Sequence, residues 1–574
     1  MLAVGRTSSA RAWPWGLALV FLVGLLMKLP TLGVGFFADD YVQQVVLTGQ
    51  RGPLPIPLWN LYDWGTAADW TGFGREHEAL PWWTASDWKV RFFRPLTSLS
   101  LGLDHALWGS DARGYHVTNL FLWLVLLALA YRLYRALGLA SGVATTALFV
   151  FVLSDSSSVP VGWIANRNTL LEAALACAAV LAALRGRAAG ALVLGLAAAL
   201  SKESGSFALL LLAWILQRRG QGRAALGALA LFGAELAFLV LEGYGTRSLF
   251  YSTPWSDPGA FLANLALLAS GGVLALLGPL PLDLTLLLPG ARIGLLLLGV
   301  AAGWPLAVWI VRRAPNGPSR SLALAWTALF LVPQAGALPA DRLLFVPSIG
   351  AAALLALAWS GERARWHELS RLRRVGAGAL ALSVTLGSGL LLLAQDVDVL
   401  PGMARHLRDK ALATELGPPA SARLEVLVLQ TESQMQAFTL ASTWHAVNED
   451  ESVRFSLLQS GPRALRWTRT GERTFELETL GRPFLDGPFE RVNLVTNQTP
   501  SVGTRWKAYP FEVEALAVDA SGLRRIRVAL DRSLDDPTLR FLRPIEGVLS
   551  PIAPPAIGAT IEIAEAVSTR RSVP

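Results

Sequence analysis

The sequence contains very little cysteine and little charge. Cys177 is the single cysteine among 574 residues, so no intrachain disulfide can form and a cysteine-ligated metal site is disfavoured. Charged residues make up 16% of the chain, well below the roughly 25% of soluble domains. Glycine-rich nucleotide-binding motifs, heptads and tetratricopeptide repeats are also absent. These absences exclude a disulfide-stabilised scaffold and disfavour a soluble nucleotide-binding enzyme.

Apolar residues dominate the composition. They make up 53% of the chain, and the mean hydropathy is +0.44, which is typical of a polytopic membrane protein. The net charge of +8 would suit nucleic-acid binding, but the arginines fall in short clusters between apolar runs rather than along one basic face. We therefore expect a lipid bilayer, and no nucleic acid, as a partner.

Apolar segments divide the N-terminal two thirds of the chain into candidate membrane spans, because a helix needs about 20 apolar residues to cross the hydrocarbon core. The run at 13–33 lacks a clear cleavage site, so we interpret it as an uncleaved first span. Residues 261–290 are expected to be re-entrant or to cross twice, which gives roughly 11–13 spans in total. The other candidates are residues 117–135, 139–154, 168–184, 188–201, 205–217, 224–242, 292–311, 321–338, 343–360 and 375–394.

Arginine clusters orient these segments. They fall on alternate loops, as the positive-inside rule predicts for cytoplasmic loops. The other loops are then extracytoplasmic, and we expect the protein to lie in a plasma (inner) membrane. The clusters are Arg6 and Arg11, Arg132 and Arg135, Arg185 and Arg187, Arg218, Arg219 and Arg223, Arg312, Arg313 and Arg320, and the group from Arg363 to Arg374.

The first outer loop, about residues 36–116, is long and rich in tryptophan. Indole rings favour the headgroup level of a bilayer, so we expect most of these tryptophans to form an interfacial belt. Stacking on sugars is the alternative role. The tryptophans are Trp59, Trp64, Trp70, Trp82, Trp83, Trp88 and Trp108.

After about residue 395 the composition becomes that of a soluble domain. Residues 434–447 suit a helix, and strand-like runs follow, such as VRFSLLQ, RTFELETLG, FEVEALAV, RRIRVAL and TLRFLRP. The predicted fold class is an α-helical polytopic membrane protein, residues 1–395, with a C-terminal soluble β-rich domain, residues 396–574. The parity of the arginine loops places this domain outside the cytoplasm. Binding of a substrate chain and structural packing are equally open as its role.

The outer loops carry isolated polar residues at helix ends. Charged groups at membrane level are costly and indicate functional sites by default, although snorkelling anchors are the alternative for any single residue. Extracytoplasmic loops usually contain few Lys and Arg residues, so several isolated cations on these loops indicate a shared functional site. The residues are Asp39, Asp40, Arg94, His116, Asn166, Arg167, Lys202, Glu203, Asp341 and Arg342.

Four stretches together carry a resemblance to a known family. They are ADDYVQQ (38–44), FRPLTSLSLGLDHALWGSDARGYHVTNL (93–120), LSKESG (200–205) and DRLLFVPSIG (341–350). The combination resembles the C-fold (GT-C) glycosyltransferase superfamily. Its likeness is to the protein O-mannosyltransferase-like branch and the transmembrane-and-tetratricopeptide O-mannosyltransferases, although the repeats of the latter are absent. The resemblance covers about residues 13–394.

This resemblance implies an inverting glycosyltransferase active in protein glycosylation or in building the cell envelope. Such an enzyme moves a sugar from a polyprenyl-phosphate donor to an acceptor protein or glycan on the extracytoplasmic face. It implies that a carboxylate of Asp39 or Asp40 is the catalytic base or orients the acceptor. The physical chemistry agrees, because an attacking hydroxyl must lose its proton to a group within hydrogen-bond reach.

The leaving polyprenyl phosphate calls for cations near the membrane surface. Arg342 and Lys202 are the first candidates because each lies in a stretch that carries the resemblance. Arg94 is a further candidate, and is equally suited to holding one of the two aspartates in place. Arg167 is the fourth, and its alternative is simple exposure beside a helix capped by a neighbouring asparagine.

Three other residues complete the candidate substrate-binding set. His116 and Asn119 share one helix face at i and i+3, and Glu203 is either a substrate contact or the counter-ion of Lys202. We expect no required cofactor. A divalent metal ion is a weaker alternative, because the spacing of its candidate ligands matches no defined motif. Those ligands are Asp39, Asp40, Asp104 and His105.

Other functions remain compatible with the same pattern. A ligase or polymerase of lipid-linked glycans has related topology and differs in its donor. A transporter or flippase of lipid-linked glycans predicts polar groups near mid-bilayer, for which Glu235 is the one candidate. An inert anchor for an interaction domain does not need so many spans. The sequence identifies neither the sugar nor the acceptor nor the polyprenyl carrier.

Overall fold

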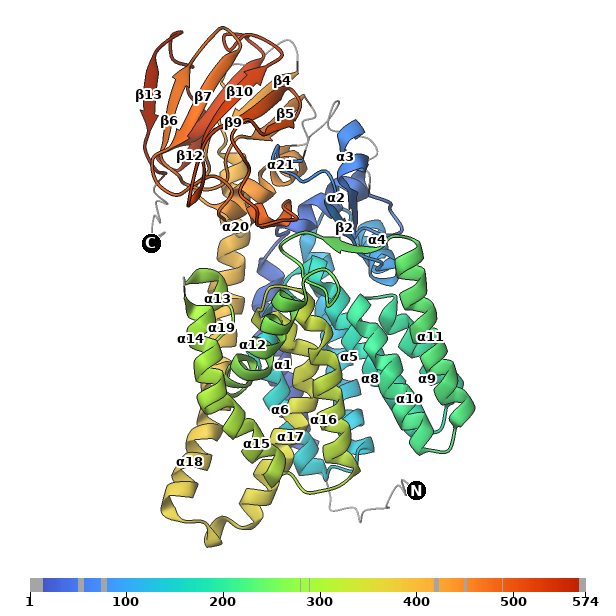
Figure 1. Ribbon diagram of the computed structural model, residues 1–574. Helices are drawn as coiled ribbons and strands as arrows, with labels where there is room; N and C mark the ends of the chain where they lie inside the picture. The colour runs from blue at the N-terminus through green and yellow to red at the C-terminus, as the bar shows by residue number, and fades with distance from the viewer. Residues whose placement is uncertain are drawn as a thin grey trace. The chain divides into compact units, whose positions relative to one another are not determined.

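The computed structural model describes residues 14–49, 56–73, 80–278, 280–288, 290–417, 423–448, 452–487 and 489–566 (Figure 1). The chain divides into two compact units, each assembled from segments far apart in the sequence. Unit 1 comprises Met1–Phe36, Phe92–Tyr244 and Ser252–Met403. Unit 2 comprises Phe37–Arg91, Gly245–Tyr251 and Ala404–Pro574.

Unit 1 is a bundle of apolar helices (Figure 1). Trp123, Phe151 and Phe345 are fully buried in its core, with ring centroids 5.5–6.1 Å apart, and such large rings dominate the energetics of a core. The helices are α1 (Pro14–Lys28), α4 (Pro95–Trp108), α5 (Ala112–Ala136), α6 (Ser141–Val152), α7 (Ser158–Gly162), α8 (Arg167–Leu184), α9 (Ala188–Ala199), α10 (Phe207–Arg218), α11 (Gly222–Leu241), α12 (Pro258–Leu277), α13 (Leu284–Leu287), α14 (Ala291–Leu298), α15 (Trp304–Arg313), α16 (Pro318–Leu331), α17 (Phe345–Ala364), α18 (Arg371–Leu382) and α19 (Ser388–Ala394). Helix α20 (Leu400–Leu412) continues from unit 1 into unit 2.

Eight helices in the described part of the chain are long and apolar enough to cross a membrane, or up to nine with the bent pair α6 and α7. The expected α-helical membrane fold is therefore confirmed, but with fewer candidate spans than the 11–13 expected. The difference arises mainly where expected spans form short helices. Helices α9 and α10 have 12 residues each and α16 has 14, below the ~20 needed for a straight crossing. The eight are Trp15–Gly33, Ala112–Ala136, Ile164–Leu184, Gly222–Leu241, Pro258–Leu277, Ala291–Arg313, Asp341–Ala364 and Arg371–Leu412.

Residues near both ends of the segment 261–290 form hydrogen bonds with the same connection in unit 1. Near its beginning, the Asn264 amide donates to the carbonyl oxygen of Ala335 at 3.0 Å. Near its end, the Leu282 backbone N–H donates to Asp341 Oδ1 at 2.8 Å. Both partners belong to the short connection between α16 and α17. The described part of the segment contains one helix long enough to cross a membrane, α12, followed by the four-residue α13, so the expectation that it is re-entrant or crosses twice stays a prediction.

The described residues of unit 2 form three sheets, and several strands of the two larger ones are labelled in Figure 1. A six-stranded antiparallel sheet has the order β13-β6-β7-β10-β9-β8, and a four-stranded sheet has the order β12-β11-β4-β5, in which β11, β4 and β5 are parallel. A third sheet, β1-β2-β3, draws on the first outer loop. The strands are β1 (Asp63–Thr66), β2 (Lys89–Arg91), β3 (Gly245–Arg247), β4 (Leu424–Val428), β5 (Val453–Leu457), β6 (Leu465–Arg469), β7 (Thr474–Thr479), β8 (Arg505–Lys507), β9 (Phe511–Asp519), β10 (Gly522–Leu530), β11 (Leu539–Ile545), β12 (Val548–Pro551) and β13 (Thr560–Ile563).

Among the described residues, three α-helices lie wholly within unit 2. The predicted helix at 434–447 is confirmed as α21 (Gln434–Asn448), which is the crossover between the parallel strands β4 and β5. Helix α2 (Asp39–Thr48) packs against α21, and α3 (Ala67–Phe73) follows β1. The start of the first outer loop is therefore part of the same compact unit as the C-terminal strands.

Three of the loop tryptophans are buried in protein, so the expected interfacial belt is wrong for them. Trp82, Trp83 and Trp88 are 3–4% exposed. The indole N–H of Trp82 donates to the carbonyl oxygen of Leu458 at 3.0 Å, and that of Trp88 to Val492 O at 2.7 Å. A buried indole is stable in a protein core once its N–H finds an acceptor, and both carbonyls lie in the C-terminal part of the chain.

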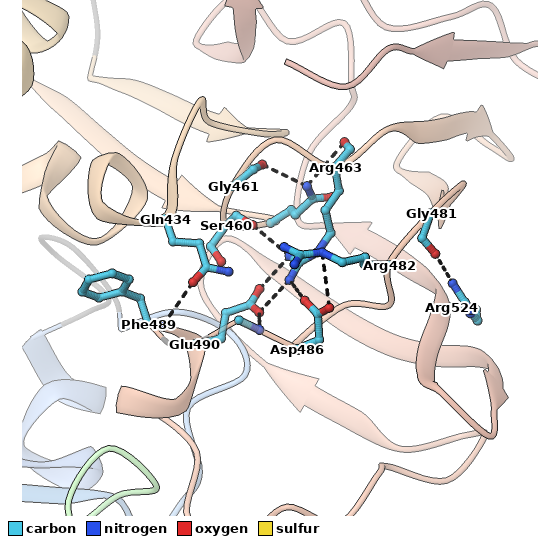
Figure 2. A network of polar contacts seen from close by, with 12 residues as sticks. Gln434, Ser460, Gly461, Arg463, Gly481, Arg482, Asp486, Phe489, Glu490 and Arg524 are labelled. Carbon is cyan, nitrogen blue, oxygen red and sulfur yellow. Dashed lines mark hydrogen bonds and ion pairs between the residues drawn. The ribbon is translucent and has the colours of Figure 1, made fainter. Parts of the chain in front are cut away.

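A buried ion-pair network stabilises the turn that receives Trp88. The Arg463 guanidinium donates to both Glu490 carboxylate oxygens at 2.8–2.9 Å and also pairs with Asp486 (Figure 2). Glu490 begins the turn Glu490–Val492. This turn and the two residues after it also bind Ala85, Ser248 and Leu249 through backbone oxygens. The network therefore supports the attachment of the first outer loop to the C-terminal region.

Candidate active site

The two aspartates begin α2 in unit 2, and their environments differ. Asp40 is 1% exposed, and its Oδ2 accepts a hydrogen bond from the Phe37 backbone N–H at 2.9 Å. Ala38, directly before α2, has a φ of 49°, a conformation that is costly for a residue with a side chain and is often found at functional sites. Two acids in the first turn favour a helix start through the helix dipole. Asp40 therefore holds the strained entry to α2.

Asp39 lies on the surface of a cavity within unit 2. This cavity has a volume of about 250 Å³, and Asp39 is one of the residues that line it. The neighbouring side chain of Tyr41 is buried, and burial, with a smaller effect of the Asp40 charge, raises the pKa of Tyr41 to about 12. Tyr41 does not line the cavity, and Asp39 is the carboxylate of α2 that does.

Unit 1 gathers cations at one end of its helices. The Arg94 guanidinium pairs with the Glu203 carboxylate, with Nη2 to Oε2 at 2.8 Å and Nε to both oxygens at 3.0–3.1 Å. Glu203 also accepts from the Phe93 backbone N–H at 3.1 Å. Glu203 is therefore the direct ion-pair partner of Arg94, and it acts on Lys202 only through a longer-range electrostatic interaction.

Lys202 contacts residues of α8 instead. Its ammonium donates to Thr169 Oγ1 at 3.0 Å and lies 3.7 Å from Glu172 Oε2. Glu172 is fully buried, and within the described residues neither of its carboxylate oxygens has a hydrogen-bond partner. Glu172 is not among the residues predicted from the sequence, although a glutamate inside the apolar run LLEAALAC indicates a functional group in a membrane segment.

Arg342 completes this group, which we call the cation cluster: Arg94, Glu172, Lys202, Glu203 and Arg342. The Arg342 guanidinium lies 5.7 Å from the centroid of the Trp163 ring, and Arg342 is near enough to act electrostatically on Lys202. Within the described part of the chain, the Arg342 side chain has no hydrogen bond and no ion pair, and Trp163 is its nearest ring contact. The cluster contains three cations and two carboxylates. Two more carboxylates lie close to it, because Asp341 directly precedes Arg342 and Glu235 acts electrostatically on Glu203.

Three predicted substrate-binding residues are buried and contact protein groups. Arg167 is fully buried and binds Asp104 Oδ2 at 2.5 Å, Asn119 Oδ1 at 2.6 Å and Tyr115 O at 2.9 Å. The alternative of an exposed Arg167 is therefore wrong. The His116 Nε2 lies 3.0 Å from the carbonyl oxygen of Gly35. These contacts connect α4, α5 and α8 to the chain that leads towards Asp39.

The suggested metal ligands are divided between the units. Asp39 and Asp40 belong to unit 2, whereas Asp104 and His105 lie on α4 in unit 1. Asp104 accepts from Thr118 Oγ1 at 2.8 Å besides its pairing with Arg167. No group of three or more His, Cys, Asp or Glu residues in the described ranges has an arrangement that could hold a metal ion.

Comparisons with known proteins give likeness to solved structures alone. No family model and no curated protein matches the sequence. The chain is similar to the Archaeoglobus fulgidus oligosaccharyltransferase tethered to an acceptor peptide, with 11% identity, a TM-score of 0.43 and coverage of 78% of this chain; the match spans 64% of that protein. It is also similar to ArnT from Cupriavidus metallidurans bound to undecaprenyl phosphate, with 12% identity, a TM-score of 0.38 and coverage of 78% of this chain and 90% of ArnT. The corresponding values for ArnT in the apo state are 14%, 0.40, 76% and 85%.

Proposed function

We propose that this protein is an inverting membrane glycosyltransferase that moves a sugar from a polyprenyl-phosphate donor to an acceptor. The observation that carries the proposal is the gathering of three cations, Arg94, Lys202 and Arg342, at one end of the helices of unit 1. The Arg342 side chain has no anionic partner among the described residues. The Lys202 ammonium lies 3.7 Å from the Glu172 carboxylate. A lipid phosphate supplies the missing anion, and preorganised cations stabilise it as it leaves.

Each cation has a distinct role in this proposal. Arg342 binds the phosphate through the paired N–H groups of its guanidinium, and the Trp163 ring supports the cation from one side. Lys202 adds a point charge. Arg94 forms an ion pair with Glu203, so its proposed role is to position the cluster rather than to contact the donor.

Asp39 is the proposed base, and Asp40 is a positioning residue. In the transfer, the acceptor hydroxyl oxygen forms a bond to the anomeric carbon as the bond from that carbon to the phosphate oxygen breaks. The electron pair of the broken bond stays on the polyprenyl phosphate, and the hydroxyl proton moves to the Asp39 carboxylate. A single displacement inverts the configuration at the anomeric carbon.

The proposed orientation is that the cation cluster faces the outside of a plasma (inner) membrane. Helix α9 separates Lys202 from Arg185 and Arg187, and α10 separates it from Arg218 and Arg219. The arginine-rich loops thus lie at the opposite helix ends from the cluster. The positive-inside rule assigns those loops to the cytoplasm.

Replacing Arg342 by Ala is expected to weaken donor binding about 10- to 100-fold, because a hydrogen bond to a charged group contributes about 1.5–3 kcal/mol. The Lys variant keeps the charge and loses the bidentate contact, so a smaller loss is expected. The measurement is binding of radiolabelled polyprenyl-phosphate monosaccharides to the purified protein. Lipid-linked oligosaccharides form a second arm, and preference for them would favour the ligase alternative.

Arg312→Ala is the matched control for this substitution. Arg312 is exposed in the last turn of α15, outside the cation cluster, so its loss should leave donor binding unchanged. Equal affinity of the wild type and Arg342→Ala for every donor would contradict the proposed phosphate site.

A further inference from the structure

The cavity of unit 2 is lined by many aromatic side chains. Four tryptophans of the first outer loop line it, together with rings from the rest of unit 2. The aromatic lining residues are Trp64, Trp70, Trp82, Trp88, Tyr251, Phe438, Phe455, Tyr509 and Phe511. A concave site with aromatic walls and few polar groups is typical of a small-molecule site.

The indole N–H groups of three of these walls bind the protein itself. Trp82 donates to Leu458 O at 3.0 Å, and Trp88 donates to Val492 O at 2.7 Å. Trp70 donates to the carbonyl oxygen of Trp64 at 2.6 Å. These contacts fix the orientation of the rings and use their donors, so the three rings offer a ligand carbon surface rather than hydrogen bonds.

The polar groups of the cavity are few and carry no positive charge. Asp39 is the one carboxylate among the described lining residues, which contain no Lys, Arg or His. Ser456 also lines the cavity; it is 9% exposed, and its buried hydroxyl has no hydrogen-bond partner within the described residues. Asn493 adds an amide. A buried hydroxyl without a partner is costly, and a ligand hydroxyl satisfies it.

We propose that this cavity binds a neutral carbohydrate ring, and that this ring is the acceptor of the transfer. A sugar ring presents apolar C–H groups that stack on indole faces and hydroxyls that bond to Asp39, Ser456 and Asn493. The Asp39 charge disfavours an anionic sugar. As the acceptor, the ring places a hydroxyl against Asp39, so this identification rests on the proposed function.

The test uses the full-length protein in a detergent without a sugar headgroup. Saturation-transfer NMR and titration calorimetry measure binding of maltose, cellobiose, glucose 6-phosphate and a serine- and threonine-rich peptide. We expect saturable binding of at least one neutral disaccharide and weaker binding of glucose 6-phosphate. Binding of the peptide alone, or of none of the probes, would overturn the carbohydrate assignment.

Trp64 is the lining residue chosen for replacement. Among the described contacts only its backbone oxygen, and not its side chain, takes part in a hydrogen bond. Trp64→Ala should weaken binding of the disaccharide about tenfold, the loss expected for one stacked ring. Trp64→Phe should restore most of it. Trp255→Ala removes a tryptophan that is 76% exposed and should change nothing. A disaccharide that binds the Trp64→Ala protein as tightly as the wild type does not occupy this cavity.

Donor binding separates the two proposals. If the disaccharide binds in a Trp64-dependent manner but no polyprenyl-phosphate sugar binds, the cavity is a carbohydrate site and the transferase function fails. If donors bind in an Arg342-dependent manner and Trp64→Ala leaves the KM of every acceptor unchanged, the transferase function stands and the acceptor site lies elsewhere.

Discussion

Replacing Asp39 by Asn is expected to slow sugar transfer about 10²- to 10⁴-fold, the usual contribution of a general base. The amide is close to the carboxylate in size, but it does not take the proton of the acceptor hydroxyl. Donor binding should be unaffected, because the cations proposed to hold the phosphate belong to a different set of residues. The measurement is kcat with saturating labelled donor, alongside the donor-binding assay.

Asp40→Asn is the matched control for this substitution. Its side-chain carbonyl oxygen still accepts the hydrogen bond that the Phe37 N–H donates to Asp40, so α2 should begin as before. We expect a smaller loss of rate than for Asp39→Asn. A wild-type rate in Asp39→Asn, or a larger loss in Asp40→Asn, would show that the base has been assigned to the wrong carboxylate.

Replacing Lys28 by Met is expected to lower the free energy of unfolding by about 3–5 kcal/mol, because it leaves a buried carboxylate without its cation. The Lys28 ammonium lies 2.8 Å from Asp396 Oδ2, and both side chains are at most 1% exposed. Ser158 Oγ donates to the other Asp396 oxygen at 2.6 Å. The pair joins the candidate span Trp15–Gly33 to Arg371–Leu412. Thermal unfolding of the purified protein in detergent measures the loss.

The double variant Lys28→Met with Asp396→Leu is the decisive comparison. Removing both charges also removes the cost of burying them, so the double variant should be more stable than Lys28→Met alone. The single variants Lys28→Met and Asp396→Leu are measured beside it. If the double variant loses stability equal to the sum of their two losses, the residues act independently and the ion pair does not stabilise this contact.

Hydrophobic periodicity along the sequence predicted individual helices and strands of the C-terminal region. The run at 434–447 forms α21, and the alternating run FEVEALAV forms part of β9, because hydrophobic periodicity determines which face of an element is buried. Tryptophan composition was a weaker guide. An indole suits both a bilayer interface and a protein core, and Trp82 became a core residue because Leu458, 376 positions away, supplies an acceptor.

For the candidate site too, some features were predictable from the sequence and others depended on the tertiary structure. Composition and the arginine clusters alone identified a membrane protein with isolated charges at helix ends, since the cost of charge in lipid depends on each residue and its neighbours in sequence. The pairing of those charges depended on distant segments. Arg94 pairs with Glu203, 109 positions away, and Arg167 binds both Asp104 and Asn119. Asp39 lines a cavity whose walls come from both the first outer loop and the C-terminal region. Such pairings follow from packing in three dimensions, which hydrophobic periodicity along the chain does not encode.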